Sequence, residues 1–317
     1  MIDKELKKHD TLLAFKKELK EKREPHTILF VSGDSLLSEK MMKTFAQAIL
    51  CEDLCDECLN CKKLLSDNHP DVMYFPTKNQ LLVEDSNKIS SESFIRPIFA
   101  DKKVFVIKDF DKSTAEAQNK LLKIFEEPNE NVYYLLSTTN IEKVLPTIRS
   151  RCFKISLPIL EKSQIEKEII ASCDKELVLE LGKGNLGKTI ELSRKRDLEE
   201  IFGIAKSIFC EMKNSKQVVI YANKILAKKE SFDLIVEMVC QILEDLLAKI
   251  CKKEELIVLK SQTNFFELIV NDFSVKSVCE IEKLIRKLQE ERFFNVNLPA
   301  IVDNLLLGIL EVKYLCK

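Results

Sequence analysis

Apolar residues follow two different periods along the chain. In the first half, short apolar runs rich in β-forming residues alternate with segments of helical spacing. The runs lie at 27–31, 72–75, 103–107, 132–137 and 153–157, and the helical segments include 11–22, which Asp10 can cap, and 114–127. Strands that alternate with helices predict an α/β fold with a mostly parallel sheet and helices on both faces.

Beyond Pro158 the pattern becomes almost entirely helical. Seven of the eight prolines precede residue 159, and the next is Pro299. Short helices are expected at 164–171, 175–181 and 186–193, and a wide apolar stripe over 232–250 indicates a long buried helix. Cys240 and Cys251 are placed in this helix and interpreted as small core residues. We predict an α/β domain over 1–158, a three-helix domain over 159–196 and a helical domain over 197–317.

The stretch 27–50 is a strand, a loop and an amphipathic helix, the order in which a phosphate-binding P-loop occurs. Gly33 aligns with the first glycine of G-x-x-x-x-G-K-[ST]. The second glycine is then replaced by Ser38, the lysine by Glu39 and the hydroxyl residue by Lys40. An ordinary α/β turn that was never a P-loop remains an alternative.

These replacements oppose phosphate binding. A phosphate cradle turns successive backbone N–H groups inward, which glycines make easy, and Gly33 is the only glycine before Gly182. A carboxylate at Glu39 would repel a triphosphate by on the order of 4 kcal/mol per like-charge pair at ~4 Å. Lys40 does not replace the lysine, because one helical step turns its side chain by about 100°.

The acid that holds magnesium in a P-loop ATPase is also replaced. It would follow the apolar strand 103–107, where the chain has Lys108. Asp109 or Asp111 comes next and could reach a metal ion, but Lys108 repels one at the expected position. We interpret the two replacements together as an ATPase site that has been lost.

Cys51, Cys55, Cys58 and Cys61 form a C-x3-C-x2-C-x2-C cluster. Four thiolates suit a tetrahedral, structural zinc site, with His69 the less favoured ligand. The alternative is a set of reduced thiols, and redox catalysis is less favoured because the context is not thioredoxin-like.

Arg151 follows the loop 138–149 within Ser150-Arg151-Cys152. A surface ion pair is the usual role of such a residue. A second possibility is that the planar guanidinium reaches the nucleotide of a neighbouring subunit. The residues alone leave both open.

Composition narrows the class of protein. The 317 residues carry a net charge of −1, so there is no global basic field, and 45% of them are hydrophobic. The sequence has no apolar run long enough for a membrane span, and Met1-Ile2-Asp3-Lys4 opens no signal peptide. We expect a cytoplasmic protein without a membrane partner, in which eleven cysteines do not form lasting disulfides.

Two motifs resemble those of a known family. Residues 117–128, AQNKLLKIFEEP, are similar to A-x-N-x-L-L-K-x-x-E-E-P, and residues 145–152, LPTIRSRC, are similar to L-P-T-I-x-S-R-C. With the cysteine cluster after the P-loop helix, they resemble the delta-prime subunits of the bacterial DNA polymerase III clamp loader, within the AAA+ family. The resemblance covers most of residues 26–157.

The resemblance implies a RecA-like AAA+ domain, a three-helix lid and a helical collar that joins a hetero-pentameric ring. Motor subunits keep an intact P-loop, whereas delta-prime subunits commonly do not. Gly184-Asn185-Leu186-Gly187 places a glycine where motor subunits carry a sensing arginine, and Thr138 and Thr139 occupy the sensor position. The first cysteine gap, three residues long, is shorter than the family usually shows.

We therefore expect a non-catalytic stator that binds structural zinc and no ATP. It would join tau/gamma-type motor subunits and a delta subunit, supply Arg151 as an arginine finger, and help to load the sliding clamp on primer-template DNA. An active, tau/gamma-like motor ATPase is the alternative. A zinc-dependent DNA-binding module is disfavoured by the acidic pairs Glu52-Asp53 and Asp56-Glu57 in the cysteine cluster.

Overall fold

A computed structural model describes residues 2–169, 174–293 and 297–315. The chain divides into two compact units. The N-terminal unit consists of Met1–Glu168 with Gly184–Lys188, and the C-terminal unit of Ile169–Lys183 with Thr189–Lys317. The domain boundaries at 158 and 196 stay a prediction.

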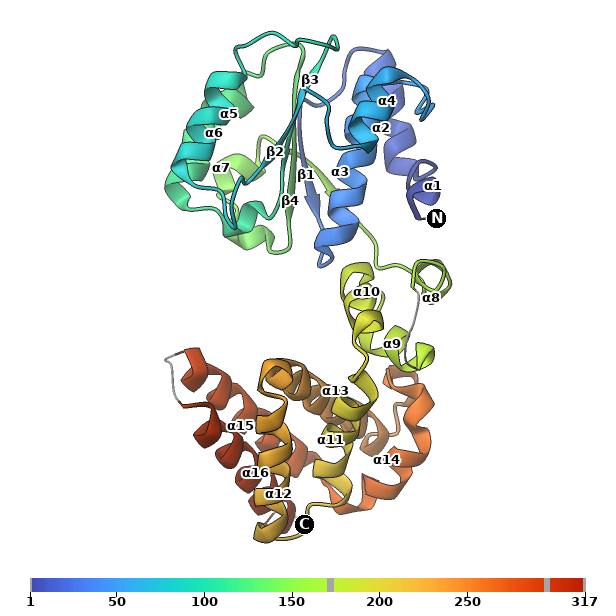
Figure 1. The fold of residues 1–317 in the computed structure, drawn as a ribbon, viewed down its shortest axis with the longest axis vertical. Coiled ribbons are helices and arrows are strands. Elements are labelled where there is room, and N and C mark those ends of the chain that lie inside the picture. Colours follow the sequence, from blue (N-terminus) through green and yellow to red (C-terminus); the bar gives the residue numbers. More distant parts are fainter. Residues whose placement is uncertain (1, 170–173, 294–296, 316–317) are drawn as a thin grey trace. The chain divides into compact units, whose positions relative to one another are not determined.

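The N-terminal unit is built on a five-stranded parallel sheet with the strand order β2-β3-β4-β1-β5 (Figure 1). The strands are β1 (Thr27–Val31), β2 (Val72–Phe75), β3 (Lys103–Ile107), β4 (Val132–Thr138) and β5 (Phe153–Ser156). Each predicted strand is confirmed to within one residue. Leu29 of β1 pairs with Leu136 of β4 on one side and Lys154 of β5 on the other. Because all strands are parallel, the loops after β1, β3 and β4 meet at one edge.

Helices cover both faces of this sheet, as the alternating pattern predicts (Figure 1). One face carries α1 (Ile2–Leu6), α2 (Asp10–Lys20), α3 (Ser35–Leu50) and α4 (Leu59–Leu65), and the other α5 (Val83–Glu92), α6 (Ala115–Glu126) and α7 (Pro146–Arg149). The short 3-10 turns η1 (Phe110–Lys112) and η2 (Ile141–Lys143) follow β3 and β4.

The predicted cap of α2 is wrong. The N-cap is His9, whose side chain accepts a hydrogen bond from the backbone N–H of Thr11. Asp10 is the first helical residue, where its negative charge still favours the helix N-terminus.

Aromatic residues fill the core on both faces of the sheet. On the α3 face, Phe45 packs against Phe15 and Phe30 with ring centroids 4.9 and 5.0 Å apart. On the α6 face, Tyr134 lies 5.4 Å from Phe105 and 5.1 Å from Phe125. Burial on both faces explains why the strands appear in the sequence as continuous apolar runs.

The short helices after β5 differ from expectation at their start. They are α8 (Lys162–Ile165), α9 (Lys175–Gly182) and α10 (Leu186–Arg194). The predicted helix 164–171 is wrong in its bounds, and its residues 170 and 171 lie outside the described residues. Gln164 accepts a hydrogen bond from the backbone N–H of Glu161 at 3.0 Å, so it caps α8 from inside the helix.

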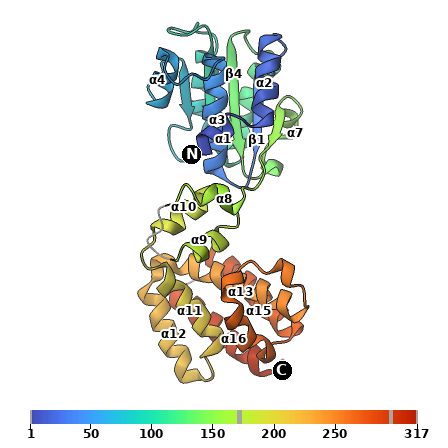
Figure 2. The ribbon, with the colours of Figure 1, turned by 90° about the vertical axis from the view of Figure 1, so that its right-hand side faces the viewer.

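The remaining chain forms a helical bundle (Figure 2). Its helices are α11 (Leu198–Cys210), α12 (Ser215–Ala227), α13 (Phe232–Ile250), α14 (Thr263–Ile269), α15 (Val275–Phe293) and α16 (Leu298–Leu315), with the 3-10 turns η3 (Lys229–Ser231), η4 (Glu254–Leu256), η5 (Lys260–Gln262) and η6 (Val270–Asp272). None of the helices in the described ranges is long and apolar enough to cross a membrane.

The apolar stripe of α13 is buried as predicted, with Ile235, Val239 and Ile242 fully enclosed. The expectation that Cys240 and Cys251 are core residues is wrong for Cys251. That residue follows the end of the helix as its C-cap and is exposed. Cys240 is partly exposed.

Candidate functional site

The loop after β1 is organised by Asp34, which is only 5% exposed. Its carboxylate caps α3 by accepting a hydrogen bond from the backbone N–H of Leu37 at 3.0 Å. The same carboxylate accepts the backbone N–H groups of Leu186 and of Gly187, the latter at 3.4 Å, in the first turn of α10. The N–H groups of two helix N-termini therefore meet on one carboxylate, as they would on a bound phosphate.

Asn185 and Gly187 complete this contact. The Asn185 side-chain amide donates to the carbonyl oxygen of Gly33 at 2.9 Å, and its oxygen accepts the backbone N–H of Lys188 at 2.8 Å. A Cβ atom at Gly187 would lie 3.2 Å from Cβ of Leu36, so glycine permits the close approach of α10. We call Asp34 with residues 184–188 the Asp34 clasp.

The three residues that replace the P-loop signature either form an ion pair with another side chain or are enclosed in the protein interior. Glu39 forms an ion pair with Lys108, with Oε1 and Nζ 2.5 Å apart, so the two replacements neutralise each other. Lys40 pairs with Asp3 of α1 at 2.9 Å. Ser38 is 1% exposed, and its hydroxyl has no hydrogen-bond partner among the described residues, so it is enclosed rather than presented to a phosphate.

The two aspartates near the expected magnesium position are engaged in hydrogen bonds. Asp109 accepts the hydroxyl of Ser35 at 3.2 Å and pairs with Lys112 at 2.8 Å. Asp111 accepts the backbone N–H of Thr139 at 3.1 Å and its hydroxyl at 3.0 Å. These carboxylates join the loops after β1, β3 and β4 to one another. Thr138, the other residue of the sensor position, is buried at the end of β4.

Arg151 lies between α7 and the edge strand β5. Its Nη1 donates to the carbonyl oxygen of Thr147 at 2.7 Å, and its Nη2 forms an ion pair with Glu126 at the end of α6. The side chain is 35% exposed. Arg151 precedes β5, whereas the loop with Gly33 follows β1, so the two lie at opposite ends of parallel strands, which a four-residue strand separates by about 10 Å.

The four cysteines that sequence analysis singles out converge between α3 and α4. All four sulfur atoms lie within 4.8 Å of one another, and those of Cys51 and Cys55 are 3.7 Å apart. Four sulfurs held about 2.3 Å from a common zinc ion would be separated by about 3.8 Å. The cluster therefore fits a tetrahedral metal ion without large movement, despite the short first gap.

The surroundings of the cluster shift the pKa values of two of its thiols in opposite directions. Backbone N–H groups of Cys58 and Glu57 point at the Cys55 sulfur and lower the pKa of this thiol to about 7. Burial raises the pKa of Cys61 to about 12, and the Gln47 side-chain amide donates to its sulfur at 3.1 Å.

His69 makes other contacts. Its Nδ1 accepts the backbone N–H of Asp71 at 3.1 Å, and its Nε2 lies 3.3 Å from the side-chain oxygen of Asn60. The group of residues able to hold a metal ion consists of the four cysteines, within the part of the chain that the structure describes.

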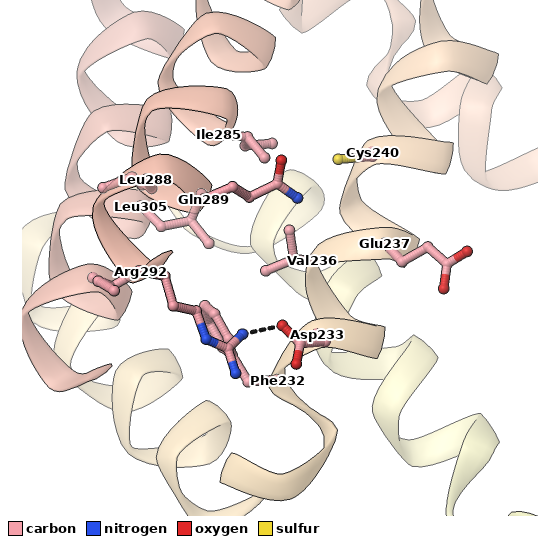
Figure 3. Close-up of a pocket in the computed structure, with 11 residues that line it drawn as sticks. Phe232, Asp233, Val236, Glu237, Cys240, Ile285, Leu288, Gln289, Arg292 and Leu305 are labelled. Carbon is pink, nitrogen blue, oxygen red and sulfur yellow. Dashed lines mark hydrogen bonds and ion pairs between the residues drawn. The ribbon is translucent and has the colours of Figure 1, made fainter. Parts of the chain in front are cut away.

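A further pocket of about 390 Å³ lies in the C-terminal unit between α13, α15 and α16 (Figure 3). Its wall is mainly apolar, with Val236, Ile285 and Leu305 facing the opening. At one side Arg292 forms an ion pair with Asp233 and stacks over Phe232. The carboxylate of Glu237 and the thiol of Cys240 also line the pocket.

Sequence analysis missed Asp34, Asn185 and Glu126. Asp34 carries a recognisable signal, because an aspartate directly before a helical apolar pattern is a typical N-cap. Its bonds to residues 186 and 187 have no such signal, because they join positions far apart in the chain. Glu126 was part of a quoted motif, but nothing in the spacing links it to Arg151.

Comparison with known proteins shows similarity to one family of replication proteins. A family model described as "DNA polymerase III, delta subunit" matches residues 7–161. A DNA polymerase III subunit delta' from Buchnera aphidicola subsp. Schizaphis graminum is 26% identical over 310 residues, 93% of both chains. The chain is thus similar to DNA polymerase III subunits delta' over much of its length.

Other relatives of this family match less of their length. The delta' protein of Bacillus subtilis is 31% identical over 150 residues, and the match covers 46% of each chain. A tau/gamma subunit from Haemophilus influenzae is 29% identical over 163 residues, which are 50% of this chain and 24% of that one. The chain thus spans half or less of the length of these two relatives.

A solved structure supports the fold. A DNA polymerase III gamma subunit-related protein from Thermotoga maritima aligns with a TM-score of 0.50 at 18% identity, over 96% of this chain and 100% of that one. With the parallel sheet, the helices on both faces and the helical C-terminal part, this confirms the predicted fold class, an α/β domain followed by helical parts.

Proposed function

We propose that this chain is the non-catalytic stator of a DNA polymerase III clamp loader, and that it binds no ATP. One observation carries the proposal: groups of the chain itself fill the P-loop position. Asp34 takes the helix N-terminal N–H groups that a phosphate would use, and Glu39 is paired with Lys108. A triphosphate would have to displace Asp34 from these N–H groups and would also have to approach the carboxylate of Glu39.

The same geometry supports a role for Arg151 in another subunit. Arg151 and the P-loop position lie at opposite ends of parallel strands, so the guanidinium cannot serve its own chain's site. Arg151 is partly exposed beside the edge strand β5, where a neighbouring subunit can approach. We propose that it enters the neighbour's ATP site and stabilises charge on the γ-phosphate during hydrolysis.

The proposed partners follow from the relatives. Similar proteins are named as tau/gamma and delta' subunits of DNA polymerase III. We propose that this chain joins tau/gamma-type motors and a delta subunit in a hetero-pentameric ring. The ring would load the sliding clamp on primer-template DNA in the cytoplasm, with the C-terminal helical bundle as the collar.

We further propose that Cys51, Cys55, Cys58 and Cys61 hold one structural zinc ion. A set of four thiolates leaves no open coordination position, so the ion would contribute to folding and not to catalysis. Gln47 is its neighbour in α3, because the amide of this residue donates to the Cys61 sulfur.

The isolated protein is expected to bind no ATP and to hydrolyse none above background. Equilibrium binding of a fluorescent ATP analogue and phosphate release measure the two properties, with a purified tau/gamma-type motor as positive control. Turnover that disappears in Lys40→Ala would overturn the stator proposal and favour the alternative, an active motor ATPase. Mixing with motor and delta subunits tests assembly directly.

Protein purified without chelators is expected to contain one zinc ion per chain, by elemental analysis. Cys58→Ser should lose the ion and unfold mainly the segment between α3 and α4, because a structural zinc site stabilises the region of its ligands. Hydrogen exchange would localise the change. Cys251→Ser, at an exposed cysteine outside the cluster, is the matched control and should keep the metal. The zinc proposal would be contradicted by wild-type protein that contains no metal and whose segment between α3 and α4 is still protected from hydrogen exchange.

A further inference from the structure

Arg151 rests on a carboxylate of its own chain. Its Nη2 pairs with Glu126, and its Nη1 donates to the carbonyl oxygen of Thr147 at 2.7 Å. The two charged side chains are 35% and 44% exposed. A guanidinium has five N–H donors, so these contacts leave others free to bind an external anion. The ion pair therefore orients the Arg151 side chain and leaves N–H donors of its guanidinium available to an external anion.

Helix α6 fixes both ends of the segment that carries Arg151. Near the start of this helix, the Gln118 amide donates to the carbonyl oxygen of Lys143 at 3.1 Å, and its oxygen accepts the backbone N–H of Leu145 at 2.8 Å. Glu126 is the last residue of the same helix. Phe125 and Leu121 anchor α6 in the core.

We propose that Glu126 is a positioning residue that aims Arg151 at the nucleotide of the neighbouring subunit. This inference rests on the proposed arginine-finger function. An arginine on a loop loses much side-chain freedom when it binds a phosphate, and an anchor that already restricts the side chain reduces that loss. The benefit falls on the transition state, so Glu126 affects the turnover number of the partner and not its affinity for ATP.

A competing role predicts the opposite sign. If Glu126 holds Arg151 away from the partner, the guanidinium must break this ion pair before it reaches a phosphate. Removal of the carboxylate would then raise the ATP turnover of the complex. The sign of the change therefore separates the two roles.

The test uses the reconstituted complex of this chain with motor subunits, delta subunit, sliding clamp and primed DNA. Glu126→Ala is expected to lower DNA-stimulated kcat by about two- to fivefold, the contribution of a partly exposed ion pair, with KM for ATP unchanged. Glu126→Gln keeps an acceptor oxygen and should recover most of the activity. Glu127→Ala, at the exposed neighbour of Glu126, is the matched control and should behave as wild type.

A double variant distinguishes this inference from the function beneath it. If Glu126 acts through Arg151, adding Glu126→Ala to Arg151→Ala causes no further loss. A loss in Arg151→Ala with wild-type activity in Glu126→Ala would overturn the positioning role and leave the arginine finger intact. Wild-type activity in both single variants would overturn both. Higher turnover, or failed ring assembly measured by gel filtration, in Glu126→Ala would also reject the positioning role.

Discussion

Arg151→Ala is expected to abolish most ATP hydrolysis at the one site that this subunit completes in the clamp-loader ring. Arginine fingers contribute roughly 10³–10⁵ to the rate of phosphoryl transfer, because they offset charge that develops on the γ-phosphate. In the proposed ring the other ATP sites do not depend on Arg151 of this chain, so the loss per complex should be smaller than the loss at this site. DNA-stimulated ATPase assays and clamp-loading assays on the reconstituted complex measure both effects.

The structure supplies sharp controls for this variant. Arg151→Lys should also fail, because an ammonium group cannot reproduce the planar guanidinium. Both variants should keep the melting temperature of the isolated chain nearly unchanged, since a partly exposed ion pair such as that with Glu126 contributes at most about 1 kcal/mol. A mutant complex that assembles and hydrolyses ATP at the wild-type rate would assign Arg151 to an ordinary surface ion pair.

Asp34→Ala is expected to destabilise the isolated chain by about 2–4 kcal/mol. The substitution removes the N-cap of α3, typically worth about 1 kcal/mol. It also leaves the backbone N–H groups of Leu186 and Gly187 without their charged acceptor. A hydrogen bond to a charged group contributes about 1.5–3 kcal/mol, and the Gly187 bond adds little because it is 3.4 Å long. Urea unfolding of the isolated protein measures the loss.

Asp34→Asn is the matched variant, since an asparagine caps a helix as well as aspartate but carries no charge. Asparagine keeps one acceptor oxygen for the Leu37 and Gly187 N–H groups but places an amide NH2 against the N–H of Leu186. Asp34→Asn should therefore keep the α3 cap, and the loss that remains relative to wild type reports the bond to Leu186. Limited proteolysis should cut near residues 184–188 in Asp34→Ala before it cuts the wild type. Equal stability of Asp34→Ala and wild type would show that the clasp contributes nothing in solution.

Much of the fold could be predicted from local sequence patterns. The five strands were predictable because each is a run of β-forming residues bounded by turns. The motifs that contain Arg151 and the four cysteines were recognisable because their residues are adjacent or closely spaced. Features that depend on distant contacts were not. Asp34, for example, reaches Leu186, 152 positions along the chain. Two local contacts were missed as well, because His9 caps α2 in place of Asp10 and Gln164 caps α8 from inside the helix. In each case more than one hydrogen-bond partner was possible, and the local sequence does not indicate which one forms the bond.

The same distinction between local patterns and distant contacts applies to the candidate site. The losses at Glu39 and Lys108 were visible as unsuitable residues at known positions, but their mutual ion pair required helix α3 and the loop after β3 to meet at one edge of the sheet. Sequence analysis could therefore identify what the site lacks. Only the folded chain reveals which groups occupy the space instead.

The strand order has a consequence for synthesis of the chain. β1 ends at Val31, but its two neighbours in the sheet begin at Val132 and Phe153. At roughly 5–20 residues per second, a ribosome needs on the order of 5–20 s between them. Throughout that interval β1 and the apolar face of α3 have been made but lack the strands that bury them. The N-terminal third of the chain therefore passes through a period in which it depends on chaperones or on transient collapse to avoid association with other nascent chains.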